Sequence, residues 1–192
     1  MSRSRSLSTS SLLVVLAGSG ALGAAGCGDD DCGPGGAPAS GLTVSSAEVA
    51  LVYGGLSALA GNDCPDPDAP AGVVSISIEG RTADDTGLVT LCIPRPDRLM
   101  EGGRTLGTAL STADVRIFDL GGTADGCTYA LDTTRPPLGT ATGTGVCSNG
   151  TDPAGFAIEI DGNVSLRRTC GQTIDLVAVA LSGRVAVSQR AQ

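Results

Sequence analysis

Alternation of apolar and polar residues with a period of two constrains the fold of this chain more than any other feature. Residues 74–79 and residues 89–93 both alternate in this way, and residues 80–87 between them are rich in turn-forming types. Successive side chains of a β-strand point to opposite faces of a sheet, so the pattern predicts strands with one buried face. The two runs together predict a β-hairpin.

Three further regions carry strand patterns. Residues 42–52 predict one strand. Residues 115–118 and 127–131 flank the turn-rich residues 121–126 and predict a second hairpin. Residues 156–160 and 164–166 predict a third, in which the apolar faces coincide only if Ile160 lies opposite Val164. That register makes Asp161-Gly162-Asn163 a three-residue connection.

The C-terminal part of the chain predicts two more strands. Residues 176–181 are apolar without alternation, which is typical of a strand covered on both faces. Ser182-Gly183 then predicts a turn into residues 184–187. Glycine makes up 29 of the 192 residues, about twice its usual share of ~7%, which disfavours long helices. We therefore expect an all-β fold, an antiparallel β-sandwich or jelly-roll-like barrel of about nine short strands.

The first 27 residues have the layout of an export signal. Arg3 and Arg5 precede an uncharged apolar segment that ends in small residues at Ala24-Ala25-Gly26-Cys27. This ending resembles the lipobox of bacterial lipoproteins, which implies that Cys27 is diacylated through its thiol and becomes the new N-terminus. It departs from the commonest pattern by having Ala24 in place of Leu.

Two other interpretations of this segment are weaker. An uncleaved anchor needs ~20 mainly apolar residues, and here Ser, Thr and Gly dilute the segment. Ordinary cleavage after Ala39 would leave the acidic residues Asp29–Asp31 between the apolar core and the cut. We therefore expect a signal peptide at residues 1–26, an acidic tether rich in Gly and Pro at residues 27–41, and one β domain at residues 42–192.

The cysteine count points to disulfide bonds. Setting Cys27 aside leaves an even six in an exported chain, which predicts three disulfides. No pair has the close spacing of a zinc knuckle, and no histidine is available to activate a catalytic thiol. Cys147 with Cys170 is the expected pair, because the predicted third hairpin would return the chain toward Cys147. The six are Cys32, Cys64, Cys92, Cys127, Cys147 and Cys170.

Composition excludes several kinds of activity. The absence of histidine removes Ser-His-Asp triads and histidine-bearing metal sites. All 12 basic residues are arginine. The chain from Cys27 onward contains 10 of these arginines and 20 acidic residues, so its net charge is −10. A chain this acidic lacks the basic stripe that binds phosphates, so nucleic acid is not an expected partner.

Acidic residues provide the only other candidate chemistry. Asp63, Asp66 and Asp68 are weak candidates for calcium, but two prolines between them and the absence of a Glu at the twelfth position argue against an EF-hand and favour a solvated loop. Asp85-Thr86-Gly87 spells the triplet of aspartic proteases once only, where a hairpin should turn. The chain also contains four glutamates that could in principle form a glycosidase pair, namely Glu48, Glu79, Glu101 and Glu159.

These observations lead to a ranked expectation. The leading hypothesis is a non-enzymatic lipoprotein of the cell envelope, lipid-anchored at a membrane and facing the periplasm or the cell surface. It would have no cofactor, and its β domain would serve structure or contact with other envelope proteins. The alternative is a ligand-binding or adhesive β-sandwich that uses its acidic loops and a divalent cation. An acid-based hydrolase comes third.

Overall fold

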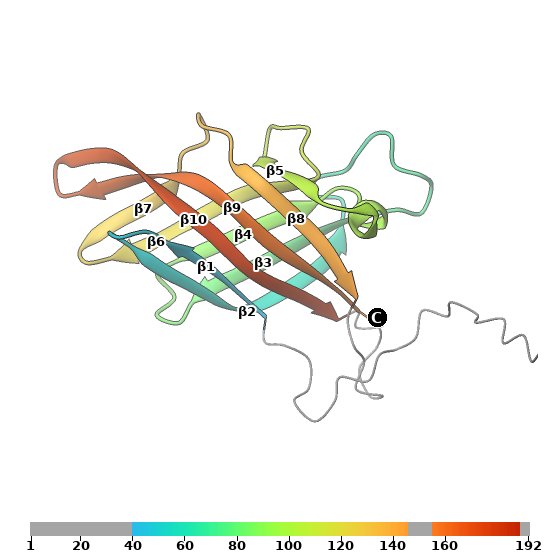
Figure 1. The fold of residues 1–192 in the computed structure, drawn as a ribbon, viewed down its shortest axis with the longest axis horizontal. Coiled ribbons are helices and arrows are strands. Elements are labelled where there is room, and N and C mark those ends of the chain that lie inside the picture. The colour runs from blue at the N-terminus through green and yellow to red at the C-terminus, as the bar shows by residue number, and fades with distance from the viewer. Residues whose placement is uncertain (1–39, 146–154, 189–192) are drawn as a thin grey trace, which may run out of the picture.

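The computed structural model describes residues 40–145 and 155–188, and this part of the chain is built almost entirely of β-strands (Figure 1). A 3-10 helix, η2 (Pro96–Glu101), lies between the fourth and fifth strands. No helix in these two ranges has the length and hydrophobicity needed to span a bilayer. The ten strands are β1 (Gly41–Ser45), β2 (Ala50–Gly61), β3 (Ser75–Thr82), β4 (Leu88–Ile93), β5 (Arg104–Thr108), β6 (Val115–Ala124), β7 (Cys127–Leu131), β8 (Leu138–Gly145), β9 (Gly155–Cys170) and β10 (Thr173–Ser188).

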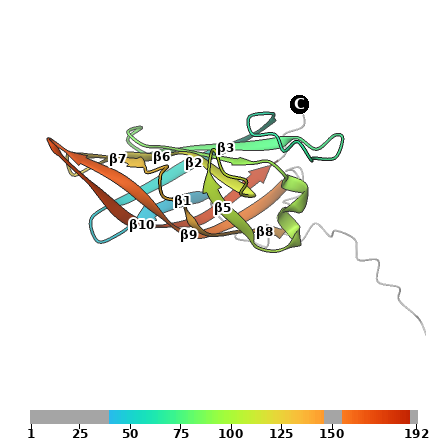
Figure 2. The same ribbon diagram turned by 90° about the horizontal axis from the view of Figure 1, so that it is seen from above.

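The strands form one sheet that closes into a ring. Their order is β10-β1-β2-β3-β4-β6-β5-β8-β9-β7, with further pairings of β10 to β9 and of β6 to β7. All described pairings are antiparallel except that of β5 with β6. Seen from above, β2, β3 and β6 form one layer and β1, β9 and β10 the other (Figure 2). The expected all-β, mainly antiparallel fold is thus confirmed, with ten strands where about nine were expected.

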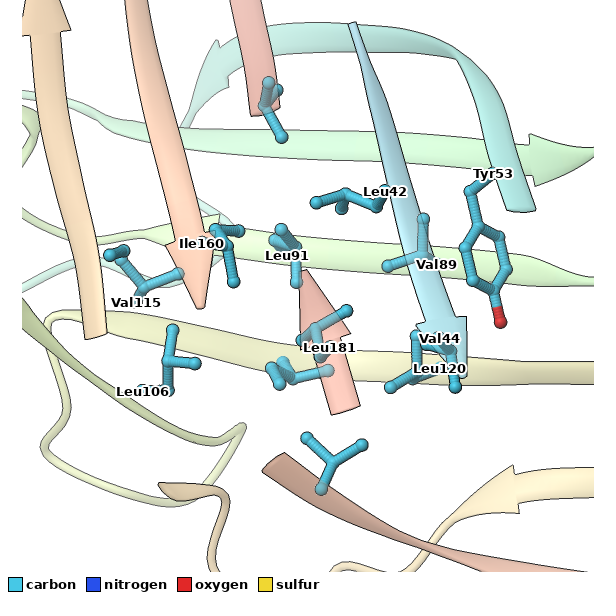
Figure 3. Close-up of a cluster of buried hydrophobic side chains, with 14 of the residues drawn as sticks. Leu42, Val44, Tyr53, Val89, Leu91, Leu106, Val115, Leu120, Ile160 and Leu181 are labelled. Atoms are coloured by element: carbon cyan, nitrogen blue, oxygen red, sulfur yellow. The ribbon is translucent and has the colours of Figure 1, made fainter. Parts of the chain in front are cut away.

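The core between the two layers is aliphatic (Figure 3). It contains the inward-facing residues of nearly every strand, including Leu42 and Val44 from β1 and Leu181 from β10, all fully buried. Tyr53 is the largest fully buried side chain, and its hydroxyl donates a hydrogen bond of 3.0 Å to the carbonyl of Gly121. Burial raises the pKa of this phenol well above its ordinary value, so Tyr53 stays neutral and serves the core.

Two of the predicted hairpins are present and one predicted strand is divided. β3 and β4 form the first hairpin, and β6 and β7 form the second around Asp125-Gly126. Residues 42–52 contain β1 and β2, which are joined by a turn in which the Ser46 amide donates to the Val49 carbonyl at 2.8 Å. Local turn chemistry therefore indicated both hairpins, although residues 121–124, expected in the second turn, belong to β6. It missed the connection at Ser46 to Val49.

The predicted third hairpin is wrong. Asp161-Gly162-Asn163 lies inside the single strand β9, and Ile160 and Val164 are buried on the same face of that strand. The period of two simply continues through Gly162, which occupies an inward position. A Cβ atom at Gly162 would lie 2.5 Å from the carbonyl oxygen of Leu138, so glycine is needed here for close strand approach.

The prediction for β10 is wrong for a similar reason. Ser182-Gly183 does not turn, because β10 runs without interruption to Ser188 and pairs with β9 along its whole length. The apolar residues 176–181 are not covered on both faces either. Val177, Val179 and Leu181 are buried, whereas Leu176 and Ala178, which alternate with them, are exposed.

Candidate functional site

The loop after β2 contains the three calcium candidates, and the structure does not bring them together as a metal site. Asp63 accepts a hydrogen bond from the Ser77 hydroxyl, and Asp66 accepts one from the Asp68 amide at 2.9 Å. Within residues 40–145 and 155–188, no group of three or more acidic or cysteine side chains is arranged to hold a metal ion. The loop instead folds around protein hydrogen bonds.

A buried arginine contacts this acidic loop. Arg95 is 8% exposed and forms two parallel hydrogen bonds to Asp97, of 2.9 and 2.7 Å. Its remaining nitrogen donates to the Asp68 carbonyl at 3.4 Å and lies 3.8 Å from a carboxylate oxygen of Asp66. These bonds from Arg95 hold the pKa of Asp97 below its usual range. Sequence analysis missed this role because 27 residues separate Arg95 from Asp68.

The Asp85-Thr86-Gly87 triplet is a turn. It connects β3 to β4, where Asp85 has a positive φ of 59° and pairs with the exposed Arg81 at 2.8 Å. Asp84 accepts hydrogen bonds from the hydroxyls of Thr82 and Thr86, and these bonds lower the pKa of Asp84. The carboxylates of Asp84 and Asp85 organise the turn.

The described glutamates lie on different parts of the ring. Glu48 is in the β1–β2 turn, and Glu159 is exposed on β9 opposite Arg184 of β10. Glu79 lines a shallow open groove of about 590 Å³ over β2 and β3, where Gly54 and its neighbours form a bulge. The side chain of Glu101 lies outside the described residues. The structure therefore brings no glycosidase pair together on the described part of the ring.

Two disulfides brace the ring. Cys64–Cys92 ties the acidic loop to β4, and both of its cysteines are buried. Cys127–Cys170 joins β7 to β9, one step beyond the Thr128–Thr169 pair, with 4.5 Å between the two Cα atoms. Because disulfides persist in oxidising compartments, the two bonds indicate an extracytoplasmic location.

The expected pairing of Cys147 with Cys170 is wrong, since Cys170 bonds to Cys127. That expectation rested on the third hairpin, which does not exist. The continuous β9 carries Cys170 to the far end of the ring, beside the start of β7. Cys27, Cys32 and Cys147 lie outside the described residues.

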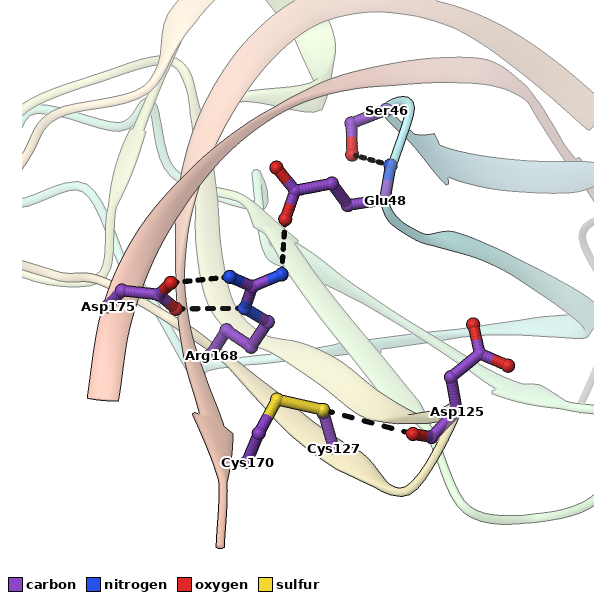
Figure 4. Close-up of polar contacts among 7 residues, drawn as sticks. All are labelled: Ser46, Glu48, Asp125, Cys127, Arg168, Cys170 and Asp175. Atoms are coloured by element: carbon purple, nitrogen blue, oxygen red, sulfur yellow. Dashed lines mark hydrogen bonds and ion pairs between the residues drawn. A yellow bond between two sulfur atoms is a disulfide. The ribbon is translucent and has the colours of Figure 1, made fainter. Parts of the chain in front are cut away.

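A cluster of charged side chains lies at the hairpin end of β9 and β10, next to the Cys127–Cys170 bond (Figure 4). Arg168 of β9 bonds to both carboxylate oxygens of Asp175 on β10 and also to Glu48 from the β1–β2 turn. Arg168 and Asp175 lie directly opposite each other on β9 and β10. They occupy the next inward-facing pair of positions after the buried pair Leu166 and Val177. Asp175 raises the pKa of Arg168, and Arg168 in turn lowers the pKa of Asp175. We call these three residues the Arg168 cluster.

The outer edge of β10 beyond this cluster has no strand beside it in the described ranges. β1 pairs with β10 only from Ala180 to Arg184, so residues 173–179 extend past the end of β1. Three exposed apolar side chains, Ile174, Leu176 and Ala178, lie on the outer face of this extension. We call these three residues the β10 edge. Sequence analysis missed it because it assumed that residues 176–181 were covered on both faces.

Comparison of the chain with protein-family models, with curated proteins and with solved structures finds no match.

The Arg168 cluster leads to a pH-dependent prediction. In Arg168→Gln, the pKa of Asp175 should rise toward the ordinary carboxyl value of about 3.9, because its hydrogen-bonding cation is lost. In the wild type, the pKa of Asp175 is lower in the folded protein than in the unfolded protein. This difference stabilises the fold at pH values above the unfolded pKa, and the stabilisation is lost as the pH falls toward the folded pKa. The variant should therefore lose less of its stability than the wild type when the pH falls below about 4.

Carboxyl-carbon NMR titration of Asp175, with thermal unfolding between pH 6 and 2, measures both effects. Arg81→Gln is the matched control, because it removes the exposed pair with Asp85 and does not touch the cluster. An unchanged Asp175 titration in Arg168→Gln would contradict the assignment.

Proposed function

We propose that this chain is a lipid-anchored protein of the cell envelope whose disulfide-braced β domain acts by contact with other proteins. The lipobox-like segment ending at Cys27 supports the anchor. A diacylated cysteine whose amine is also acylated carries more than one hydrocarbon chain, and stable membrane attachment requires two such signals. The two disulfides fit the oxidising side of the membrane to which the signal would export the chain.

The observation that carries the contact role is the β10 edge. Ile174 is 65% exposed and Leu176 is 44% exposed, side by side on a strand that projects beyond its neighbour β1. Isolated exposed apolar residues are ordinary on protein surfaces. A row of them on an open strand edge is different, because native proteins usually block such edges with charges, prolines or bulges.

The ring positions this edge firmly. Cys127–Cys170 fixes the end of β9, and Arg168 joins β9, β10 and the β1–β2 turn through side-chain bonds. β9 and β10 pair over sixteen residue positions, so the projecting hairpin is continuous with the core of the ring. A surface held in this way loses little conformational freedom when it binds a partner.

Metabolic labelling with a fatty acid tests the anchor. Label should enter the wild type and should be absent from Cys27→Ala, because the thiol is the attachment point. Cys32→Ala, which removes a cysteine five residues later, should retain the label. Equal labelling of wild type and Cys27→Ala would overturn the lipid anchor.

Crosslinking in native envelopes, followed by mass spectrometry, tests the contact role, and recovery of the chain with no crosslinked protein would overturn it.

A further inference from the structure

Strand pairing in β10 shows which backbone groups are open at its edge. Ser40 donates its hydroxyl to the carbonyl of Arg184 and accepts a hydrogen bond from the amide of Ala186. Even-numbered residues of β10 therefore direct their N–H and C=O groups toward the β1 side. The pairing with β9 continues without a shift to Thr173, so the same holds for Ile174, Leu176 and Ala178.

These groups have no described strand to pair with. β1 ends at Ser45, opposite Ala180, and its chain then turns at Ser46 to Val49 toward β2. The continuation of the path of β1 alongside residues 174–178 is bounded by Ser45 and by the β1–β2 turn, whose Glu48 reaches Arg168 opposite Asp175.

Two other strand edges in the described part of the ring are protected. The edge of β2 that extends past β1 contains a bulge between Gly54 and Ser57, with Gly55 at a positive φ of 57°, and bulges prevent regular pairing. β8 is packed against the 3-10 helix η2. The β10 edge is regular along its whole length, so it is the edge best suited to accept a strand.

Charge near the β10 edge indicates what kind of strand fits. On the inner face, Asp175 lies on the edge strand itself and Glu48 approaches from the β1–β2 turn. Arg168 compensates only one of these two carboxylates, so the Arg168 cluster keeps one net negative charge. On the outer face, the side chains beside the open groups are apolar.

We infer that the β10 edge is a strand-addition site for an extended segment of a partner protein, with apolar residues on one face and arginine or lysine on the other. Alternate residues of the segment exchange backbone hydrogen bonds with Ile174, Leu176 and Ala178 and pack against their side chains. Its basic residues lie beside Asp175 and within reach of Glu48. This inference names the partner chemistry of the proposed contact function and rests on it.

A second copy of this chain does not meet these requirements. Two β10 edges could pair antiparallel with the two-fold axis at Asp175. The two Asp175 carboxylates would then lie opposite each other, and like charges in that position are destabilising. Pairing about Leu176 instead places the hairpin tip of the second copy opposite Ala180, where Ser45 already lies.

Binding of a labelled pentapeptide, Val-Arg-Val-Arg-Val, to the full-length protein in detergent micelles tests the inference. When the central valine lies opposite Leu176, all three valines face the β10 edge and one arginine lies opposite Asp175. N-methylation of the central valine removes a hydrogen bond to β10 and should weaken binding by about tenfold. N-methylation of an arginine, whose amide faces away from β10, should leave binding unchanged and is the matched control.

Two protein variants address the same edge. Ala178→Pro removes an outward N–H without removing a hydrogen bond to β9, and Leu176→Asp places a charge in the apolar row. Each should weaken peptide binding about tenfold, whereas Leu59→Asp, at an exposed position on the bulged β2, should not. A cooperative urea transition like that of the wild type shows that each variant has folded, and Leu176→Asp serves alone if Ala178→Pro does not fold.

Four results would overturn the inference: no binding of the parent peptide at millimolar concentration, equal binding of both N-methylated forms, stronger binding of Val-Glu-Val-Glu-Val, or crosslinks from the β10 edge to a second copy. Lipid labelling of Cys27 is measured independently, so loss of the anchor and loss of strand addition are distinguishable.

Discussion

Removal of both described disulfides is expected to leave the domain close to its unfolding limit at room temperature. Cys64–Cys92 spans 28 residues and Cys127–Cys170 spans 43. In the chain-entropy model each bond then stabilises by about 3.5 to 4 kcal/mol. The two loops do not overlap along the chain, so the contributions should add to about 7.5 kcal/mol. A typical domain has a net stability of only ~5 to 15 kcal/mol.

Urea unfolding of three variants measures this effect: Cys64→Ala/Cys92→Ala, Cys127→Ala/Cys170→Ala, and all four changes together. The two bonds should also differ in accessibility. Cys64 and Cys92 are at most 3% exposed, whereas Cys127 and Cys170 are partly exposed, so a mild reductant should open Cys127–Cys170 first. Loss of less than about 1 kcal/mol in the fourfold variant would show that the closed sheet is stable without its bridges.

Substitution of Gly183 by alanine should be the most damaging single methyl addition in β10. Gly183 has a φ of 145°, and a Cβ atom there would lie 2.3 Å from the carbonyl oxygen of Gly41 and 2.9 Å from the Cα atom of Leu42. Both contacts are with the backbone of β1, which cannot move without breaking its pairing with β10. We expect a loss of about 3 kcal/mol or more in the free energy of unfolding, from backbone strain together with overpacking.

Gly54→Ala is the matched control, because a Cβ atom at that strand position meets nothing within 4 Å. Its effect should stay within about 0.5 kcal/mol, as for ordinary surface substitutions. Equal urea midpoints for Gly183→Ala and the wild type would show that β1 and β10 are not as close at this point as the structure places them.

The candidate sites show why sequence reasoning reached only part of the answer. The turn at Asp85 followed from local residue types, because aspartates and glycines act on their immediate neighbours. Arg95 and Arg168 could not be assigned in this way. Each binds carboxylates or carbonyls from elements that are distant along the chain, and only the closed sheet brings those elements together.

By itself the sequence determined the all-β class, the β3–β4 and β6–β7 hairpins and the use of disulfides, since side-chain alternation, turn chemistry and cysteine number are local properties. Tertiary structure decided everything that depends on which strand lies beside which. Gly162 and Gly183 serve close strand approach where a turn was expected, because a glycine satisfies either need and the sequence does not distinguish them. Leu176 is exposed because its side chain points to the outer face of the ring, and its backbone edge is open because β1 ends at Ser45.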